Sequence, residues 1–560
     1  MNASQVIDGE IDADVALMDA GLDSLGAVEL SELLEKAAGG ATLPGTLIFD
    51  QPTARRLTTY LATREQTTGG VKTFVAAGRK QAGDVLILGL ATQIPGGAHS
   101  PKFAWEMLAA GHDAISQVPP TRWSMGAMRH LSQPAYDRMR YGGFVRKAEV
   151  FDARHFAVSP AEAGAMDPQQ RVLLERGYQA LAESGLDKAA LEDSGTGIFI
   201  GIQALDFSEI LRSSPAGASV FAATGVNLAI SSGRLSYVLG MQGPCASYDT
   251  ACSAGLVACH AGARSVHLRE CDHGLVAGIN LMLTPWIPMA CALAGMTSPK
   301  GHSHTFDNRA DGFARAGGCS GVALSHPVDV EPLAIGRGCA VRQDGRSASL
   351  TAPSGEAQKG LLFALLSDAG AAPQVISYGE MHGTGTALGD PIEVGSYEAG
   401  ILSYRPEQPA AALGSVKASV GHAEPGAGLV GLSKLMLVLR HARSTPNTLL
   451  RVINPQVKRA LGGSRAQLAN QLGEQWDGQR HAKLSGSVSS FGYSGTIANV
   501  LLAAATKVRT SALPPFHALP CPSMPFDALP CPSMPFDALR CPSMPLDALP
   551  CPPMPFHALC

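Results

Sequence analysis

The chain has 560 residues, a formal net charge of −4 and 46% hydrophobic residues. This length allows several domains, and the small net charge gives no bias toward nucleic acid or an anionic membrane surface. No apolar run reaches the ~18 residues that a membrane-spanning helix needs. The N-terminus lacks a basic segment followed by an apolar one, so we expect no secretory signal and an intracellular, cytoplasmic protein.

The first 65 residues predict a small helical unit. Apolar residues at 25, 28, 30, 33 and 34 recur at roughly helical spacing. A second helix is expected over 53–62, after the start signal Phe-Asp-Gln-Pro at 49–52. The following segment, 66–83, is rich in Gly, Ala and Gln and is interpreted as a linker.

Residues 84–505 predict a large α/β domain. The buried-strand pattern Val-Leu-Ile-Leu-Gly-Leu at 85–90 opens it, and Val-Leu-Leu at 500–502 closes its last strand. Apolar strands alternate with long helical stretches, such as 166–183 and 355–369. This alternation favours an α/β fold with largely buried sheets.

The tail, 506–560, differs in composition. The unit Phe-Asp-Ala-Leu-Pro-Cys-Pro-Ser-Met-Pro repeats every ten residues and places cysteines at 521, 531, 541 and 551. Proline at this density excludes helix and central strand. We interpret the tail as disordered low-complexity sequence, with metal binding or disulfide cross-linking by its cysteines as the alternative.

One cysteine lies in a sequence suited to a nucleophile. Cys252, in Asp-Thr-Ala-Cys-Ser-Ala-Gly at 249–255, falls between an extended stretch (244–248) and an apolar helical stretch (255–268). A thiol at a helix N-terminus is expected to have a lowered pKa, which favours the thiolate. A lone cysteine is more often a buried structural residue, but the small residues around Cys252 leave room for a substrate.

Two histidines lie in glycine-rich segments: His382 in His-Gly-Thr-Gly-Thr and His422 in Gly-His-Ala-Glu-Pro-Gly-Ala-Gly. Closely spaced glycines indicate loops that bring backbone close to a ligand, although a histidine in such a loop can also simply cap a turn. The spacing after His382 is not a nucleotide-binding fingerprint. We therefore expect no bound nucleotide. The cysteines form no close Cys-x-x-Cys pairs, so we expect no metal site either.

Residues 84–505 resemble the β-ketoacyl synthase domain of modular (type I) polyketide synthases. Besides the cysteine and histidine motifs, the resemblance rests on Met-Asp-Pro-Gln-Gln-Arg (166–171), Phe-Asp (306–307), Ala-Asp-Gly-Phe (310–313), Gly-Ser-Val-Lys (414–417) and Ser-Ser-Phe-Gly (489–492). It implies a thiolase-like fold with five αβαβα layers. The half with the nucleophile would cover 84–330, and the half with both histidines 331–505.

The resemblance also implies a mechanism. Cys252 would carry an acyl chain, and His382 and His422 would stabilise the enolate formed when a malonyl thioester loses carbon dioxide. Lys417 would support the histidines, and the backbone N–H groups of Cys252 and Tyr493 would form an oxyanion hole. Domains of this family usually form homodimers.

The N-terminal unit resembles an acyl carrier domain, shortened at its N-terminus. Leu-Asp-Ser-Leu at 22–25 is similar to the family's attachment motif, which implies that Ser24 carries 4'-phosphopantetheine. The alternative is that Asp23 or Ser24 only caps a helix. Capping and attachment are compatible, because a serine at a helix N-terminus places an attached phosphate against free backbone N–H groups. The expected partners are a phosphopantetheinyl transferase, acyl and malonyl thioesters on carriers, and a separate acyltransferase.

Three segments depart from the family's pattern: Gly317 replaces a glutamate, Ala-Ser at 418–419 replaces Thr/Ser-Asn, and Ile-Ala-Asn at 497–499 replaces Asn-Ala-His. These departures leave two alternatives beside condensation. One is a non-elongating synthase that only transfers acyl chains, and the other is a silent dimerisation scaffold. A thiolase is disfavoured because the loop 489–492 lacks the second cysteine that a thiolase needs.

Overall fold

The computed structural model describes residues 12–18, 20–22, 24–37, 43, 47–64, 83–203, 205–476 and 484–505. The predicted linker lies outside these residues except for Gly83, and the predicted repeat tail lies outside them entirely. In the N-terminal unit, three helices form: α1 (Ser24–Ala37), α2 (Leu47–Asp50) and α3 (Ala54–Arg64). The predicted second helix is confirmed as α3, which follows Pro52 and Thr53; the Thr53 hydroxyl accepts the N–H of Arg56 at 3.3 Å.

The large domain contains one continuous sheet of eleven described strands, in the order β11-β10-β9-β12-β13-β8-β1-β7-β6-β4-β5. The strands are β1 (Val85–Gln93), β4 (Gly197–Gly201), β5 (Cys245–Tyr248), β6 (His273–Asn280), β7 (Gly318–Ser325), β8 (Ala334–Gln343), β9 (Ile376–Glu380), β10 (Ala411–Gly414), β11 (Ala466–Leu468), β12 (Ser485–Phe491) and β13 (Thr496–Ala504). β2 (Ser116–Gln117) and β3 (Tyr141–Gly142) form a separate ribbon.

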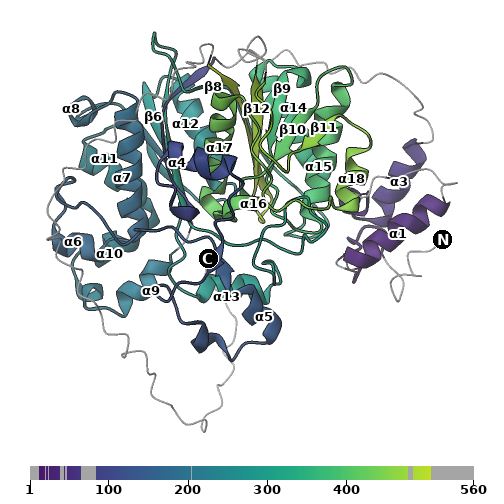
Figure 1. Cartoon of the computed structure of the whole chain (residues 1–560), viewed down its shortest axis with the longest axis horizontal. Coiled ribbons are helices and arrows are strands. Elements are labelled where there is room, and N and C mark those ends of the chain that lie inside the picture. Colours follow the sequence, from purple (N-terminus) through teal and green to yellow (C-terminus); the bar gives the residue numbers. More distant parts are fainter. Residues whose placement is uncertain are drawn as a thin grey trace, which may run out of the picture. The chain divides into compact units, whose positions relative to one another are not determined.

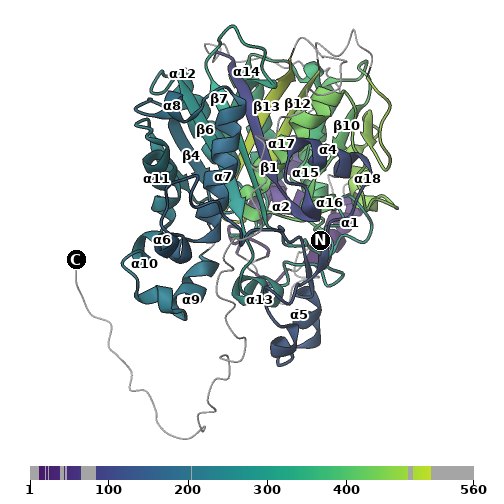
Figure 2. The same ribbon diagram turned by 60° about the vertical axis from the view of Figure 1, so that its left-hand side comes forward.

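Helices cover and separate the two halves of this sheet, which join where β1 pairs with β8. Helix α7 (Pro168–Glu183) packs on β1, β6 and β7, and α14 (Gly355–Ala369) packs on β8 and β13. Helices α12 (Ala254–His267) and α17 (Ala427–His441) contact strands of both halves. The domain therefore has the predicted five layers, with α12 and α17 in the middle (Figures 1 and 2).

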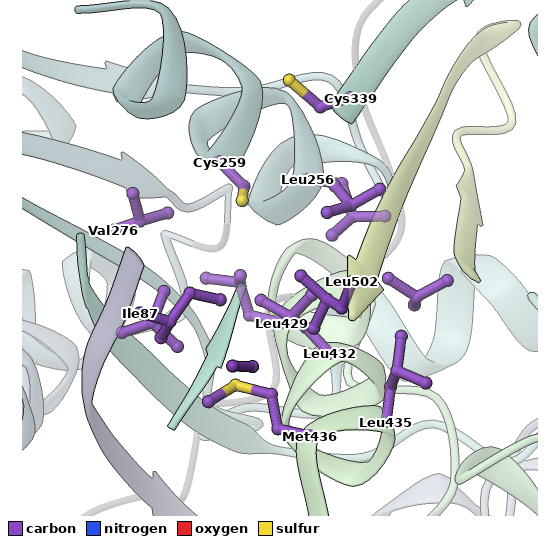
Figure 3. Packing of buried hydrophobic residues seen from close by; sticks show 14 of the residues in the cluster. Ile87, Leu256, Cys259, Val276, Cys339, Leu429, Leu432, Leu435, Met436 and Leu502 are labelled. Carbon is purple, nitrogen blue, oxygen red and sulfur yellow. The ribbon is translucent and has the colours of Figure 1, made fainter. Parts of the chain in front are cut away.

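The central layer carries the main hydrophobic core. Helix α17 is buried along residues 427–439, as expected for a helix that is apolar on all sides. Figure 3 shows its leucines packed against Leu256 and Cys259 of α12, between Ile87 of β1 and Leu502 of β13. Fully burying one such side chain contributes about 1.5–3 kcal/mol, so this core fixes the position of both central helices, whose N-terminal ends lie at the candidate site.

The remaining helices are mostly short. The α-helices are α4 (Pro101–Ala109), α5 (Gln133–Arg138), α6 (Pro160–Ala165), α8 (Lys188–Leu191), α9 (Asp206–Arg212), α10 (Ala222–Val226), α11 (Leu228–Leu239), α13 (Trp286–Leu293), α15 (Gly389–Gly400), α16 (Lys417–Val420) and α18 (Pro455–Leu461). Short 3-10 helices cover Pro95–Gly97, Met125–Met128, Pro215–Ala218, Pro373–Val375, Leu402–Tyr404 and Glu424–Gly426. None of the helices in the described residues is long and apolar enough to cross a membrane.

The predicted limits of the two long helices α7 and α14 agree with the observed ones to within two residues. The helix expected over 166–183 begins at Pro168, because the carboxylate of Asp167 accepts the N–H of Gln169 at 2.7 Å and caps the helix. The helix expected over 355–369 is confirmed with the same limits as α14.

Candidate active site

The nucleophile candidate lies on a strained turn between β5 and α12. Ala251, just before Cys252, has a left-handed backbone with φ of 54°, which is costly for a residue with a side chain. Asp249 accepts the Ala251 N–H at 3.0 Å, and the hydroxyls of Thr250 and Ser253 lie 2.9 Å apart. These contacts hold Cys252 at the tip of the turn, where the residue keeps some solvent exposure although its thiol is largely removed from water.

Cys252 lies next to the second glycine-flanked histidine. The Nε2 atom of His422 is 3.1 Å from the Cys252 sulfur. The His422 backbone is fixed by two hydrogen bonds, because its N–H donates to the Ala314 carbonyl at 2.7 Å and its carbonyl accepts the Ala316 N–H at 2.8 Å. Cys252 and His422, which were predicted to share one site, are therefore in direct contact in the structure.

The predicted low pKa of Cys252 is wrong. Burial raises the pKa of this thiol to about 12, and the negative charge of Glu424 adds to the shift, while Lys417 opposes it. The helix N-terminus is present as expected, but removal from water disfavours the thiolate more than the dipole favours it. Cys252 is thus a neutral thiol beside a proton acceptor.

His382 faces the same site from the loop after β9. Its ring lies 5.4 Å from the ring of His422, nearly perpendicular to it. The backbone N–H of Phe491 donates to His382 Nδ1 at 3.3 Å. A neutral imidazole that accepts at Nδ1 carries its proton on Nε2, so His382 is set to donate a hydrogen bond from Nε2.

Two buried carboxyl groups, which the sequence analysis did not single out, position the His382 loop. Glu393 accepts the N–H groups of His382 and Gly383 at 2.6 and 2.8 Å, and Asp390 accepts the N–H of Gly385 at 3.0 Å. Burial raises the pKa of Glu393 to about 8 and that of Asp390 to about 6. The signal was available in the sequence, because both acids follow a glycine-rich loop at the start of a helix.

Lys417 is buried at the start of α16. Burial lowers its pKa, while the charges of Glu380 and Glu393 oppose that shift. Burial also holds the pKa of both His382 and His422 well below 6.5, and the positive charge of Lys417 adds to this effect. Both imidazoles are therefore neutral at physiological pH.

A buried ion pair that the sequence analysis missed lies behind His422. The Arg315 guanidinium donates to both carboxylate oxygens of Glu424, at 2.5 and 2.7 Å, and the amide of Asn280 donates to one of them at 3.2 Å. Arg315 is also the residue whose backbone bridges to His422. The pair therefore ties the segment that bridges to His422 to the residues that directly follow His422.

The turn between β12 and β13 reaches the nucleophile turn. A side chain on Gly492 would come within 2.4 Å of the Thr250 carbonyl, and the Ser490 hydroxyl donates to the Cys252 carbonyl at 2.6 Å. Tyr493 follows Gly492, and its side chain is exposed. The role predicted for its backbone N–H stays a prediction.

The three departures from the family's pattern are accommodated by local contacts. The Ser419 hydroxyl lies 2.6 Å from that of Thr448, and the Asn499 amide donates to Ser489 at 2.9 Å. A side chain on Gly317 would approach the Asn280 carbonyl to 3.1 Å.

No group of three or more His, Cys, Asp or Glu side chains is placed to hold a metal ion within the described part of the chain. In the N-terminal unit, Ser24 is the first residue of α1, a helix of 14 residues. The backbone N–H groups at such a helix start suit a phosphate group, so this position fits an attached phosphopantetheine.

Three known families match the chain in sequence. "Beta-ketoacyl synthase, N-terminal domain" matches residues 82–327, and "Beta-ketoacyl synthase, C-terminal domain" matches 333–450. "Phosphopantetheine attachment site" matches 5–61. The matches fall on the sheet domain and on the N-terminal helical unit.

Among curated proteins, the chain is 35% identical over 512 residues to one component of the phenolphthiocerol/phthiocerol polyketide synthase of Mycobacterium tuberculosis, covering 89% of this chain and 27% of the relative. It is 37% identical over 513 residues to polyketide synthase GfsB of Streptomyces halstedii, covering 90% of this chain and 9% of that protein. The chain thus spans about a quarter or less of the length of these relatives.

Among solved structures, the chain is similar to the ketosynthase from module 6 of the bacillaene synthase of Bacillus subtilis 168. The TM-score is 0.68 and the identity 31%, covering 75% of this chain and 72% of that one. A ketosynthase domain of the oxazolomycin synthase from Streptomyces albus JA3453 gives a TM-score of 0.68 at 29% identity, covering 75% of each chain.

Proposed function

Because this chain belongs to the β-ketoacyl synthase family of modular polyketide synthases, we propose that it condenses an acyl chain held on Cys252 with a malonyl-type extender carried on a phosphopantetheine arm. The observation that carries the proposal is the placement of two neutral imidazoles around one thiol, with His422 Nε2 3.1 Å from the sulfur.

In the first step, the Cys252 sulfur attacks the carbonyl of an acyl thioester while its proton moves to His422 Nε2. The bond between the carbonyl carbon and the donor sulfur breaks, and the departing thiolate takes the proton from His422. The products are acyl-Cys252 and a free carrier thiol. A neutral His422 is the form that this step requires, and the low pKa of that residue supports it.

In the second step, the carboxylate of the malonyl thioester leaves as carbon dioxide, and its bonding electrons form an enolate. The Nε2–H of His382 is free to donate to the enolate oxygen, since Nδ1 is occupied by the Phe491 N–H. Once the donor thiol has left, a shift of the His422 proton from Nδ1 to Nε2 lets this residue donate in the same way. The enolate carbon then attacks the acyl carbonyl and the carbon–sulfur bond to Cys252 breaks. The products are a β-ketoacyl thioester and a Cys252 thiolate, which takes up one proton from solvent to return to the neutral thiol.

We assign the oxyanion hole to the backbone N–H groups of Cys252 and Tyr493. The close approach of Gly492 to Thr250 supports this assignment, because it brings the β12–β13 turn against the nucleophile turn. Lys417 is assigned a supporting role, since its charge helps to keep both histidines neutral.

We further propose that Ser24 carries 4'-phosphopantetheine, added by a phosphopantetheinyl transferase. When bound, this group supplies a thiol that carries acyl chains as thioesters. Incubation with coenzyme A and such a transferase should add the mass of one arm to the wild type and to Thr58→Ala, whose exposed hydroxyl is also in a helix of this unit. An unmodified wild type, or a modified Ser24→Ala variant, would contradict the assignment.

The remaining partners follow from the same chemistry. A separate acyltransferase would load the extender. The location of the protein would be intracellular and cytoplasmic.

We propose a homodimer formed along β5, which is the last strand of the sheet and pairs only with β4 among the described strands. Exposed apolar side chains at Tyr237 and Val220, each 88% exposed, support a protein partner.

The test of the first step is acylation of the intact protein by an acyl thioester, followed by mass spectrometry. One acyl group should add to the wild type and to Cys291→Ala, which removes another partly buried thiol. Cys252→Ala should gain none. Acylation of Cys252→Ala, or its absence from the wild type, would contradict the proposal.

A further inference from the structure

A small cavity lies near the carboxyl end of β6, at the same edge of the sheet as Cys252, because β5 and β6 both run parallel to β4. It has room for about one water-sized group, about 10 Å³. Most of its wall is aromatic or apolar. The lining side chains that matter here are Trp123, Tyr141, Phe144, Met282, Thr297 and Arg315.

Three hydrogen-bond donors line this cavity without a partner. The atoms are Trp123 Nε1, Thr297 Oγ1 and Arg315 Nη1, and none of them has a hydrogen-bond partner in the described part of the chain. Their residues are only 6%, 3% and 4% exposed. Buried polar groups are normally satisfied, and leaving one unpaired costs free energy. None of the described lining residues carries a carboxylate, so a water molecule or a substrate oxygen that enters the cavity would satisfy these groups.

The cavity adjoins the Cys252–His422 pair at three points. Thr297 forms a backbone bridge with Phe313, whose ring lies 5.1 Å from that of His422. Arg315 bridges to His422 itself. Pro288 also lines the cavity, three residues before Cys291 on helix α13, and the Cys291 thiol is near enough to contribute to raising the pKa of Cys252.

We propose that this cavity binds an acceptor oxygen on the acyl chain carried by Cys252, so that keto- or hydroxyl-bearing chains are accepted in preference to fully reduced chains. The inference rests on the proposed function, because it concerns the acyl group of that reaction. The small space suits a single oxygen atom, and the three donors suit a carbonyl oxygen that projects into it from the chain. Condensation itself leaves a keto oxygen on the third carbon of its product, so such chains are natural substrates for a later round.

The test compares rates of Cys252 acylation by synthetic thioesters of equal length. One is fully reduced, and the others carry a keto or hydroxyl oxygen at the third or the fifth carbon. For the wild type we expect a preference of about tenfold or more for at least one oxygenated chain, as sites built to bind a substrate oxygen discriminate against analogues that lack it. Thr297→Val keeps the shape of the side chain but removes the hydroxyl, and Trp123→Phe removes the N–H; each should lose most of the preference.

The matched control is Thr284→Val. Thr284 is also buried with an unpartnered hydroxyl within the described residues, but it does not line the cavity, so the preference should persist. Equal rates for all thioesters in the wild type would mean that water alone fills the cavity and would overturn the inference. A preference that survives in both Thr297→Val and Trp123→Phe would overturn it as well. If no thioester acylates Cys252, the proposed function fails too, whereas equal acylation by all of them removes only this inference.

Discussion

His422 contacts the Cys252 sulfur through Nε2 at 3.1 Å, while its own backbone is hydrogen-bonded to Ala314 and Ala316 on either side of Arg315. The base is thus held rigidly against a thiol that burial keeps protonated. Activation then depends on transfer of the proton to His422 during the attack, and not on a thiolate that exists beforehand.

This relationship predicts the pH dependence of acylation. The pKa of His422 lies well below 6.5, so the histidine is a neutral base throughout the neutral range, and the wild-type rate should be nearly constant from about pH 6.5 to pH 8. In His422→Ala the reaction needs the free thiolate, whose pKa is about 12 in the wild type. Its rate should therefore be at least about 100-fold lower at pH 7 and rise about tenfold per pH unit.

The rates are measured by stopping the acylation reaction at set times and determining the acylated fraction of the protein by mass spectrometry. His326→Ala, which removes a partly exposed histidine just after β7, should keep the wild-type profile. A His422→Ala variant with a flat profile would show that His422 is not the base.

The Glu393 carboxyl predicts a pH dependence of stability. Burial raises its pKa from 4.5 to about 8, so the folded protein holds a proton that the unfolded chain releases above pH 4.5. The stabilisation from this group is complete below pH 4.5 and is lost as the pH rises through 8. Glu393→Gln cannot titrate, so its free energy of unfolding should fall less between pH 5 and pH 8 than that of the wild type, by on the order of 1 kcal/mol or more.

Urea denaturation at both pH values checks this difference. The control is Glu356→Gln, which alters an exposed carboxyl group on α14 that pairs with Lys359. An equal pH dependence in the wild type and Glu393→Gln would contradict the assigned shift.

The Arg315–Glu424 pair predicts strong coupling between two substitutions. Arg315→Met leaves a buried carboxylate without its partner and should cost about 3–5 kcal/mol of unfolding free energy. Adding Glu424→Gln removes that charge and should restore more than half of the loss. Urea denaturation of the single and double variants measures the coupling; additive losses would contradict it. Arg269→Met, which breaks an exposed pair with Asp272, should cost less than about 1 kcal/mol.

Much of this site could be predicted from sequence because its motifs are local. Cys252, His382 and His422 stand in small-residue or glycine-rich segments whose composition reflects close backbone approach. The Arg315–Glu424 pair and the contact from Phe491 to His382 could not be found in this way, since each joins segments more than 100 residues apart. The prediction of a low pKa for Cys252 was wrong for a related reason. Burial by the whole fold raises the pKa of this thiol more than the local helix N-terminus lowers it.

The exposed face beside β5 predicts a dimer that a single charge should weaken. Tyr237→Lys places a charge in the proposed apolar interface, so the protein should shift from about twice 58.0 kDa toward 58.0 kDa in sedimentation velocity. Leu350→Lys alters an equally exposed apolar residue elsewhere and should not change the mass. A wild type that sediments as a monomer, or a Tyr237→Lys variant that dimerises as strongly as the wild type, would contradict the proposal.

The central claim is condensation, and the most direct measurement is the product formed when acyl-Cys252 protein meets a malonyl-carrier. We predict release of carbon dioxide and a β-ketoacyl chain two carbons longer on the carrier, with Cys252 returned to the free thiol. His382→Ala should acylate normally and yet fail to extend, since it retains His422 but loses the enolate donor. Acylation of the wild type without a longer product would contradict condensation and indicate an enzyme that only transfers acyl chains.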